Sequence, residues 1–193
     1  VVVNIDKTVK AIQKVIEQAE QQSGLMIKDL VVGIAGDHVE SERSRGIVGI
    51  SSQTQEISEQ DLLRAVEDSR KLAVPAERQI IHVIPQDYII DGQDGITDPV
   101  GMSGVRMEAN VHVITGLKTA IQNIIRCVER SNLTIQDLVL EPLASSSAIL
   151  TEEEKEVGVA MIDIGGGTTD IAIFHENVLR WTSVIGIAGK QVT

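Results

Sequence analysis

The sequence predicts an α/β fold that is interrupted by a smaller α+β insert. Strand–helix–strand patterns occur near both ends of the 193-residue chain, which is long enough to bury a core. A polar stretch that starts at Gly36 breaks the first pattern, and the second pattern resumes after Ile114. The predicted boundaries are therefore 1–35 and 115–193 for the α/β part and 36–114 for the insert.

Composition and charge limit the classes of function. The net charge is −11 and three residues are aromatic, so nucleic-acid binding, which needs a basic surface and stacking rings, is not expected. The acidic balance also argues against direct docking on anionic lipid. The single cysteine, Cys127, fits a reducing compartment and is expected to be a small packing residue. Together these features predict a soluble cytoplasmic protein.

The first α/β segment is predicted to hold a strand, a helix and a second strand. Val1–Asn4 is typical of a strand already under way, so the chain is expected to be a piece of a longer protein. Thr8–Gln21 repeats apolar residues at helical spacing, and Gly24 ends this amphipathic helix. Leu30–Ala35 is a continuous apolar run, which favours a strand covered on both faces.

The first half of the insert is predicted to contain one strand and one helix. Asp37–Arg45 is polar and charged, with only Val39 apolar, and Gly46–Ser51 is predicted to be a short strand. Ser58 and Asp61 have the spacing of a capping box and open a helix that ends before Pro75. The side chains expected on its buried face are Leu62, Leu63, Val66 and Leu72.

The second half of the insert is predicted to contain three strands and a long turn. Gln79–Ile84 is a strand that Pro85 stops, and Asp87–Asp91 is another. Asp91–Gly104 is rich in turn residues but lacks the ligand spacing of a calcium loop. Val105–Thr115 alternates apolar and polar residues, which is typical of a strand buried on one face.

The last α/β segment is predicted to alternate helices and strands. Leu117–Arg130 has a helical apolar stripe, Leu138–Leu140 is a short buried strand, and Pro142–Leu150 is a helix opened by proline. Thr151–Glu156 is a charged connection. Val178–Ile185 is the final strand.

A glycine-rich turn within Val157–Phe174 is the strongest candidate site. Three consecutive glycines suit a place where φ is positive or where a ligand approaches the backbone closely. The free N–H groups at such a turn bind anions, and Asp163 just before it would face the metal ion of a phosphate. A dinucleotide fingerprint would need a glycine at Asp170, and a P-loop would need Ser or Thr after Lys190. The sequence therefore predicts a phosphate-binding hairpin.

Glu141 has two interpretations. It follows a short buried strand, at the sheet edge where α/β proteins gather ligand groups, so it could hold a water or a hydrated metal ion near a γ-phosphate. It could equally be a first-turn carboxylate that the helix dipole favours.

Longer motifs resemble a known family. D-I-G-G-G-T-T-D-I-A-I-F is similar to the second phosphate motif of the actin and heat-shock chaperone ATPase superfamily, and E-P-L-A-S-S-S-A-I-L resembles the helix start before it. Within that superfamily, V-G-I-A-G-D-H, H-V-I-P-Q-D-Y-I-I-D, D-P-V-G-M-S-G-V-R-M and V-H-V-I-T resemble the FtsA family of bacterial cell-division proteins. The resemblance covers essentially the whole chain.

The resemblance implies a fold and a site. Residues 1–35 and 115–193 would belong to an actin-like (ribonuclease-H-like) subdomain 1A, and 36–114 to an SHS2-type 1C insert. The cofactors would be ATP and Mg²⁺, with Asp163 holding the metal through water and Glu141 in the catalytic position of a weak ATPase. The nucleotide-binding residues would be Gly165, Gly166, Gly167, Thr168, Thr169, Gly186 and Gly189.

The resemblance also implies a role. The intact protein would polymerise through its insert, tether FtsZ filaments to the inner membrane at the division site and recruit other divisome proteins. Membrane contact would come through a C-terminal helix outside this sequence, and the segment alone is expected to be inactive. The alternatives are a scaffold like the pilus-assembly protein PilM and a chaperone-type ATPase with fast hydrolysis.

Overall fold

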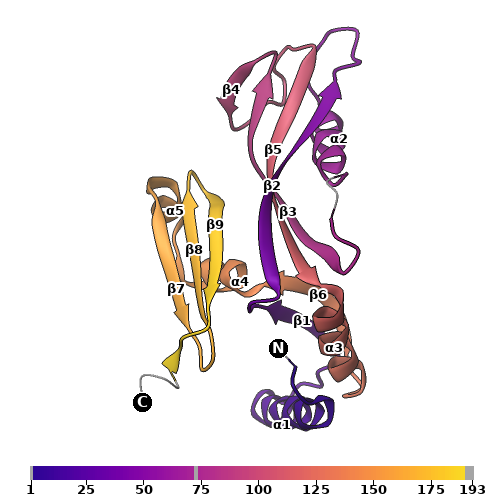
Figure 1. Cartoon of the computed structure of the whole chain (residues 1–193), viewed down its shortest axis with the longest axis vertical. Coiled ribbons are helices and arrows are strands. Elements are labelled where there is room, and N and C mark those ends of the chain that lie inside the picture. The colour runs from indigo at the N-terminus through magenta and orange to yellow at the C-terminus, as the bar shows by residue number, and fades with distance from the viewer. Residues whose placement is uncertain (1, 72–73, 190–193) are drawn as a thin grey trace.

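A computed structural model describes residues 2–71 and 74–189 of the chain (Figure 1). The described residues form three sheets, with strand orders β1-β6, β2-β5-β3-β4 and β7-β8-β9. The four-stranded sheet extends away from the rest as a long arm, and the three-stranded sheet lies beside the base of that arm. No helix in this part of the chain is both long and apolar enough to cross a membrane.

The base of the molecule is the predicted strand–helix pattern. Helix α1 (Ile5–Ser23) packs against α3 (Lys118–Glu129), and β1 (Asp29–Ile34) pairs in parallel with β6 (Thr134–Leu140). The predicted opening strand is wrong, because Asn4 is the N-cap of α1 and its side chain accepts the N–H of Lys7. β1 is also not covered on both faces, since Val31 is 62% exposed.

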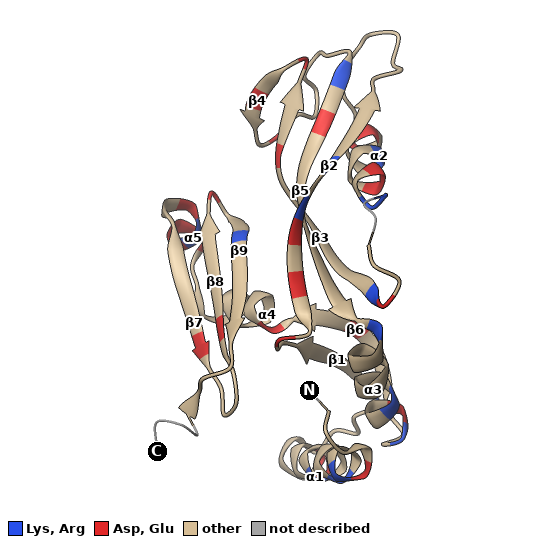
Figure 2. Ribbon diagram, viewed as in Figure 1, with Lys and Arg blue, Asp and Glu red and all other residues tan. Residues whose placement is uncertain are grey.

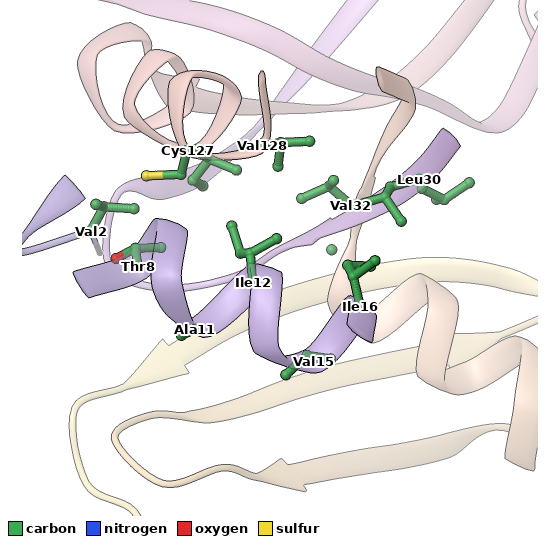
Figure 3. A pocket seen from close by; sticks show the side chains of 13 residues that line it. Val2, Thr8, Ala11, Ile12, Val15, Ile16, Leu30, Val32, Cys127 and Val128 are labelled. Atoms are coloured by element: carbon green, nitrogen blue, oxygen red, sulfur yellow. The ribbon is translucent and has the colours of Figure 1, made fainter. Parts of the chain in front are cut away.

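An apolar cavity of about 440 Å³ lies between α1, β1 and α3 (Figure 3). Figure 3 shows Ile12 and Ile16 of α1 pointing into it from one side and Val32 of β1 from another. Cys127 lines the cavity, is buried, and is the packing residue that the sequence predicted. Burial raises the pKa of this thiol, which keeps it protonated and unreactive.

The insert is an antiparallel sheet with one helix against it. Its strands are β2 (Val39–Gly49), β3 (Arg78–Ile90), β4 (Gln93–Ile96) and β5 (Arg106–Leu117). β5 is central, and it pairs with β2 from Val39↔Gly116 to Gly49↔Arg106. β4 falls inside the stretch that was predicted to be only a turn.

Helix α2 (Glu59–Ser69) begins at the predicted capping box. Ser58 and Asp61 exchange side-chain and backbone hydrogen bonds. The helix comes very close to β2, because a Cβ added to Gly46 would lie 1.8 Å from the carbonyl oxygen of Ala65. Ala65 is therefore buried and Leu63 is 69% exposed, so the predicted burial of Leu63 is wrong. Leu72 lies outside the described residues.

In two strands of the insert, pairing with β5 decides the structure against what the local sequence pattern predicts. The polar stretch 37–45 is largely the first half of β2, whose edge position leaves its charged side chains in solvent. Pro85 does not stop β3, because the register shifts between Pro85 and Asp87 and the bulge accommodates the missing N–H.

Strand β5 is buried on both faces, and the predicted one-sided burial is wrong. Met107 and Val113 pack in the core of the insert, whereas Ile114 packs in a second cluster toward β8 and β9. Among the polar residues of β5, Glu108 is buried and forms ion pairs with Arg45 and Arg106, both at 2.9 Å. These ion pairs compensate the burial of its carboxylate.

The final segment contains two helices and three strands. Helix α4 (Glu141–Ile149) begins at Glu141, and Pro142 lies in its first turn, as predicted. The predicted charged connection is a short helix, α5 (Glu152–Val157), which opens with a Thr151–Glu154 capping box. β7 (Val159–Ile164), β8 (Thr169–His175) and β9 (Val178–Ile185) follow as an antiparallel sheet.

The base of the insert and the three-stranded sheet share one core. Ile114 of β5 and Leu140 of β6 belong to the same buried cluster as Phe174 and Leu179. The Gln86 side chain of β3 also donates to the Leu179 carbonyl oxygen at 3.1 Å. β7–β9 and β1–β6 nevertheless remain separate sheets, so the assignment of 115–193 to a single subdomain stays a prediction.

Candidate phosphate-binding site

The predicted hairpin is formed by β7, β8 and the turn that joins them. The N–H of Gly165 donates to the carbonyl oxygen of Thr168 at 2.9 Å, which closes the turn. Neither Gly165 nor Gly167 has a positive φ, so left-handed geometry is not the reason for glycine at these positions. A Cβ on Gly165 would lie 3.1 Å from the Thr168 oxygen, and Gly165, Gly166 and Gly167 are all exposed. The turn thus offers bare backbone to a ligand.

The segment after β9 contacts the same turn. The N–H of Gly189 donates to the Gly165 carbonyl oxygen at 3.1 Å, and the hydroxyl of Thr169 donates to the Ile187 carbonyl oxygen at 2.6 Å. Gly189 and Thr169 therefore lie beside the glycine turn, and their role in nucleotide binding stays a prediction. Gly186 is exposed at the end of β9, and a Cβ there would meet open space.

Two aspartates face each other across the hairpin. Asp163 and Asp170 are directly paired residues of β7 and β8, so their side chains lie on the same face of the sheet. Asp163 accepts a hydrogen bond from the Ser145 hydroxyl of α4 at 3.1 Å. Asp170 is only 5% exposed, and its Oδ1 has no hydrogen-bond partner in the described part of the chain. Burial raises the pKa of Asp170, and the charge of Asp163 raises it further.

Glu141 completes this acidic group from the start of α4. Burial raises the pKa of Glu141, and the negative charges of Asp170 and Asp163 add to the effect. Gly33 of β1 leaves room for it, since a Cβ there would lie 2.7 Å from the Glu141 Cγ. A hydrated cation is the ligand that would relieve the repulsion among three carboxylates. In the described ranges, no three or more His, Cys, Asp or Glu side chains are arranged to hold a metal ion.

A histidine of the insert supports the junction that precedes Glu141. His82 Nε2 of β3 accepts the backbone N–H of Leu140 at 3.0 Å. Burial lowers the pKa of His82, which keeps the ring neutral and able to accept this bond. The end of β6, and with it the start of α4, is thereby tied to the insert.

Sequence reasoning gave no role to Asp170 or Ser145. Asp170 could have been found from hairpin register, because a turn between Ile164 and Thr169 makes Asp163 and Asp170 direct partners. Ser145 is one of three consecutive serines, and the sequence holds no signal that singles it out.

Family descriptions match two parts of the chain. Residues 36–115 match "SHS2 domain inserted in FTSA", and residues 160–193 match "Cell division protein FtsA". The first match starts at the same residue as the predicted insert and ends one residue later.

Curated relatives match the chain over its whole length. Proteins named "Cell division protein FtsA" from Pseudomonas aeruginosa and Bacillus subtilis are 51% and 44% identical over all of the chain. The protein of that name from Escherichia coli is 42% identical over 98% of it. The chain spans 46%, 44% and 45% of these three relatives, so it corresponds to about half of their length.

A solved structure has a similar fold. A chain of the "PilM-PilN type IV pilus biogenesis complex" aligns with a TM-score of 0.66 and 15% identity, over 98% of this chain and 51% of that one. At this identity the likeness supports the fold alone. With the SHS2 match, it confirms the predicted actin-like α/β fold with an SHS2-type insert.

Proposed function

We propose, since the chain belongs to the FtsA family of cell-division proteins, that its β7–β8 turn forms one wall of an ATP-binding site. The observation that carries this proposal is the pair Asp163 and Asp170 beside an exposed glycine turn. A buried carboxylate oxygen without a partner is costly, and a bound cation would compensate it. The turn and the carboxylates together would bind an anion and its counter-ion.

In the proposed complex each group has a separate task. The N–H groups of Gly166, Gly167 and Thr168 would donate to phosphate oxygens, each contributing about 1.5–3 kcal/mol, while the Gly165 N–H keeps the turn closed. Asp163 would orient the water shell of Mg²⁺, and the ion would neutralise phosphate charge when bound. Thr169, Gly186 and Gly189 would line the same wall, since Thr169 and Gly189 already contact the turn region.

Glu141 would act on water rather than on the phosphates. Its carboxylate is close enough to Asp163 and Asp170 for their charges to raise its pKa, and although part of the side chain is desolvated, the residue as a whole is exposed to solvent. It would orient a water for slow hydrolysis, so we infer that ATP mainly favours an assembled state. The partners would be FtsZ, further copies through the insert and other divisome proteins. The site of action would be the cytoplasmic face of the inner membrane at the division site, with the anchor outside this chain.

The test uses the full-length protein and two variants of the site. Asp163→Ala and Gly166→Val are expected to weaken Mg²⁺-dependent ATP binding at least about tenfold, because each removes a charge or blocks the backbone wall. Assembly measured by sedimentation should then lose its dependence on ATP. Asp94→Asn, an exposed carboxylate of β4, is the matched control. ATP binding and assembly that persist in both site variants would contradict the proposal.

A second candidate is a partner-binding scaffold with an inactive nucleotide site. The fold shared with a chain of the "PilM-PilN type IV pilus biogenesis complex" is the observation that raises it, and this likeness concerns the fold alone. In that case the full-length protein would assemble equally with and without ATP, and neither site variant would change assembly.

A further inference from the structure

We propose that a polar cavity between the insert and β9 binds a small oxyanion, a phosphate or a carboxylate group, through Arg43 and Arg180. The cavity has a volume of about 460 Å³, within the range of small-molecule sites. It is lined by Arg43 and Arg45 of β2, Gln86 and Asp87 of β3, Asn110 of β5 and Arg180 of β9, and we call it the arginine basin. It shares no residue with the β7–β8 turn, so this inference does not depend on ATP binding there.

In the arginine basin, Arg45 is already ion-paired, and the Asp87 carboxylate is hydrogen-bonded to an amide. Arg45 forms an ion pair with Glu108 at 2.9 Å and donates to Asn110 Oδ1 at 3.1 Å. The other end of the Asn110 amide donates to Asp87 Oδ1 at 2.5 Å. These contacts fix the side chains of Arg45, Asn110 and Asp87 in the lining of the basin.

Arg43 has no such partner. It is exposed, and within the described residues it makes no hydrogen bond and no ion pair. Its neighbour across the ladder is His112, which is buried, so the adjacent position on β5 supplies no negative charge. An uncompensated guanidinium at this place is notable in a chain with a net charge of −11.

Arg180 approaches the arginine basin from the other sheet. It is the single basic residue of β9 and is drawn blue in Figure 2 on the strand nearest the insert. Its side chain is 25% exposed and is held at one end by Glu176 and the His175 carbonyl oxygen. Its Nη1 donates to no group in the described part of the chain.

The arrangement fits an oxyanion for two reasons. Guanidinium groups present planar pairs of donors that match the oxygen spacing of carboxylates and phosphates. The two arginines belong to different sheets, and an anion between them would bridge the insert to β9. Because β9 is in the same sheet as the glycine turn, a bound oxyanion would stabilise the present position of the insert relative to that turn.

Calorimetric titration of the full-length protein tests the proposal. The probes are inorganic phosphate, for a free ion, and a synthetic peptide of alternating Glu and Gly, for carboxylates of a protein segment. Arg43→Gln and Arg180→Gln should each weaken binding of at least one probe about tenfold, and added salt should weaken it in the wild type. Arg43→Lys should retain part of the affinity. Arg70→Gln is the matched control, because Arg70 is an exposed arginine at the C-cap of α2 that forms an ion pair with Glu67.

The outcomes are distinguishable. A loss seen only for phosphate identifies a free ion, and a loss seen only for the peptide identifies carboxylates of a protein. Thermal unfolding of each variant checks that it folds, and ATP binding, measured separately, should equal that of the wild type. Failure of both probes to bind, or equal affinities in Arg43→Gln, Arg180→Gln and the wild type, would overturn the proposal.

Discussion

The insert and the base of the molecule bury their apolar residues to different degrees. In the insert, Ala65, Met107, Ala109 and Val113 are fully buried in one cluster between the sheet and α2. At the base, a two-stranded sheet and two helices leave an apolar cavity, and Met26 is 82% exposed. The insert has the packing of an independently folded unit, whereas the base presents apolar surface of the kind that further protein covers.

The three-stranded sheet resembles the base in this respect. Its inner face shares the cluster with Ile114, but Ile162, Ile164 and Trp181 are exposed on the strands. The sheet that carries the proposed nucleotide-binding turn is therefore packed against the rest of the chain on one face only. The isolated chain should therefore bind ATP weakly. If half the contacts of a micromolar site are lost, the binding free energy changes from about −8 to about −4 kcal/mol, which corresponds to a dissociation constant near millimolar.

The largest effect is expected where the insert is packed most tightly. Gly46→Val would force a side chain into the Ala65 carbonyl group and the Ser69 backbone, so the free energy of unfolding of the insert should fall by about 3 kcal/mol or more. Gly49→Ala, in open space on the same strand, is the matched control. Urea unfolding followed by circular dichroism measures both, and a similar loss in the two variants would contradict the comparison.

A pair of truncations compares the two regions directly. Met107→Ala should destabilise the insert by about 2–5 kcal/mol, because Met107 is fully buried. Ile12 lines the open cavity, so Ile12→Ala should lower the free energy of unfolding of the isolated chain by only about 1 kcal/mol. Urea unfolding again gives the values, and equal costs would mean that the base is packed as well as the insert.

Acid should weaken the junction between the two regions. Burial lowers the pKa of His38, His82 and His112, so each ring protonates more readily in the unfolded chain. Their contribution to stability is present above the unfolded pKa, about 6.5, and is lost as pH falls below it, by at most about 1.4 kcal/mol per pH unit for each ring. Stability measured from pH 7.5 to 5 should decline below 6.5. A smaller slope in His82→Gln would assign part of the decline to His82, and stability independent of pH in this range would refute the prediction.

The smallest effect is expected at Leu63. Its side chain is exposed on α2, so Leu63→Ala should change the free energy of unfolding by less than about 0.5 kcal/mol. A loss near that of Met107→Ala would show that another part of the protein covers this helix face.

Local chemistry made much of the fold predictable. The capping box at Ser58, the proline that opens α4 and the glycine turn after β7 each depend on residues a few positions apart. The errors have another origin. The polar half of β2, the passage of β3 through Pro85 and the burial of His112 are all decided by distant strands, which local periodicity does not report. Ser145 near Asp163 depends on the same kind of long-range packing.

The pairing of Val39 with Gly116 has a consequence for how the chain folds. β1 and β6 lie about 100 positions apart in sequence, with the insert between them, and their pairing requires closure of that loop. Once β2 and β5 have paired, the loop that must close to bring β1 and β6 together is roughly fourfold shorter. This lowers the entropic cost of closing it by about 1 kcal/mol. Early formation of the insert would therefore act as an internal template that speeds assembly of the sheet below it.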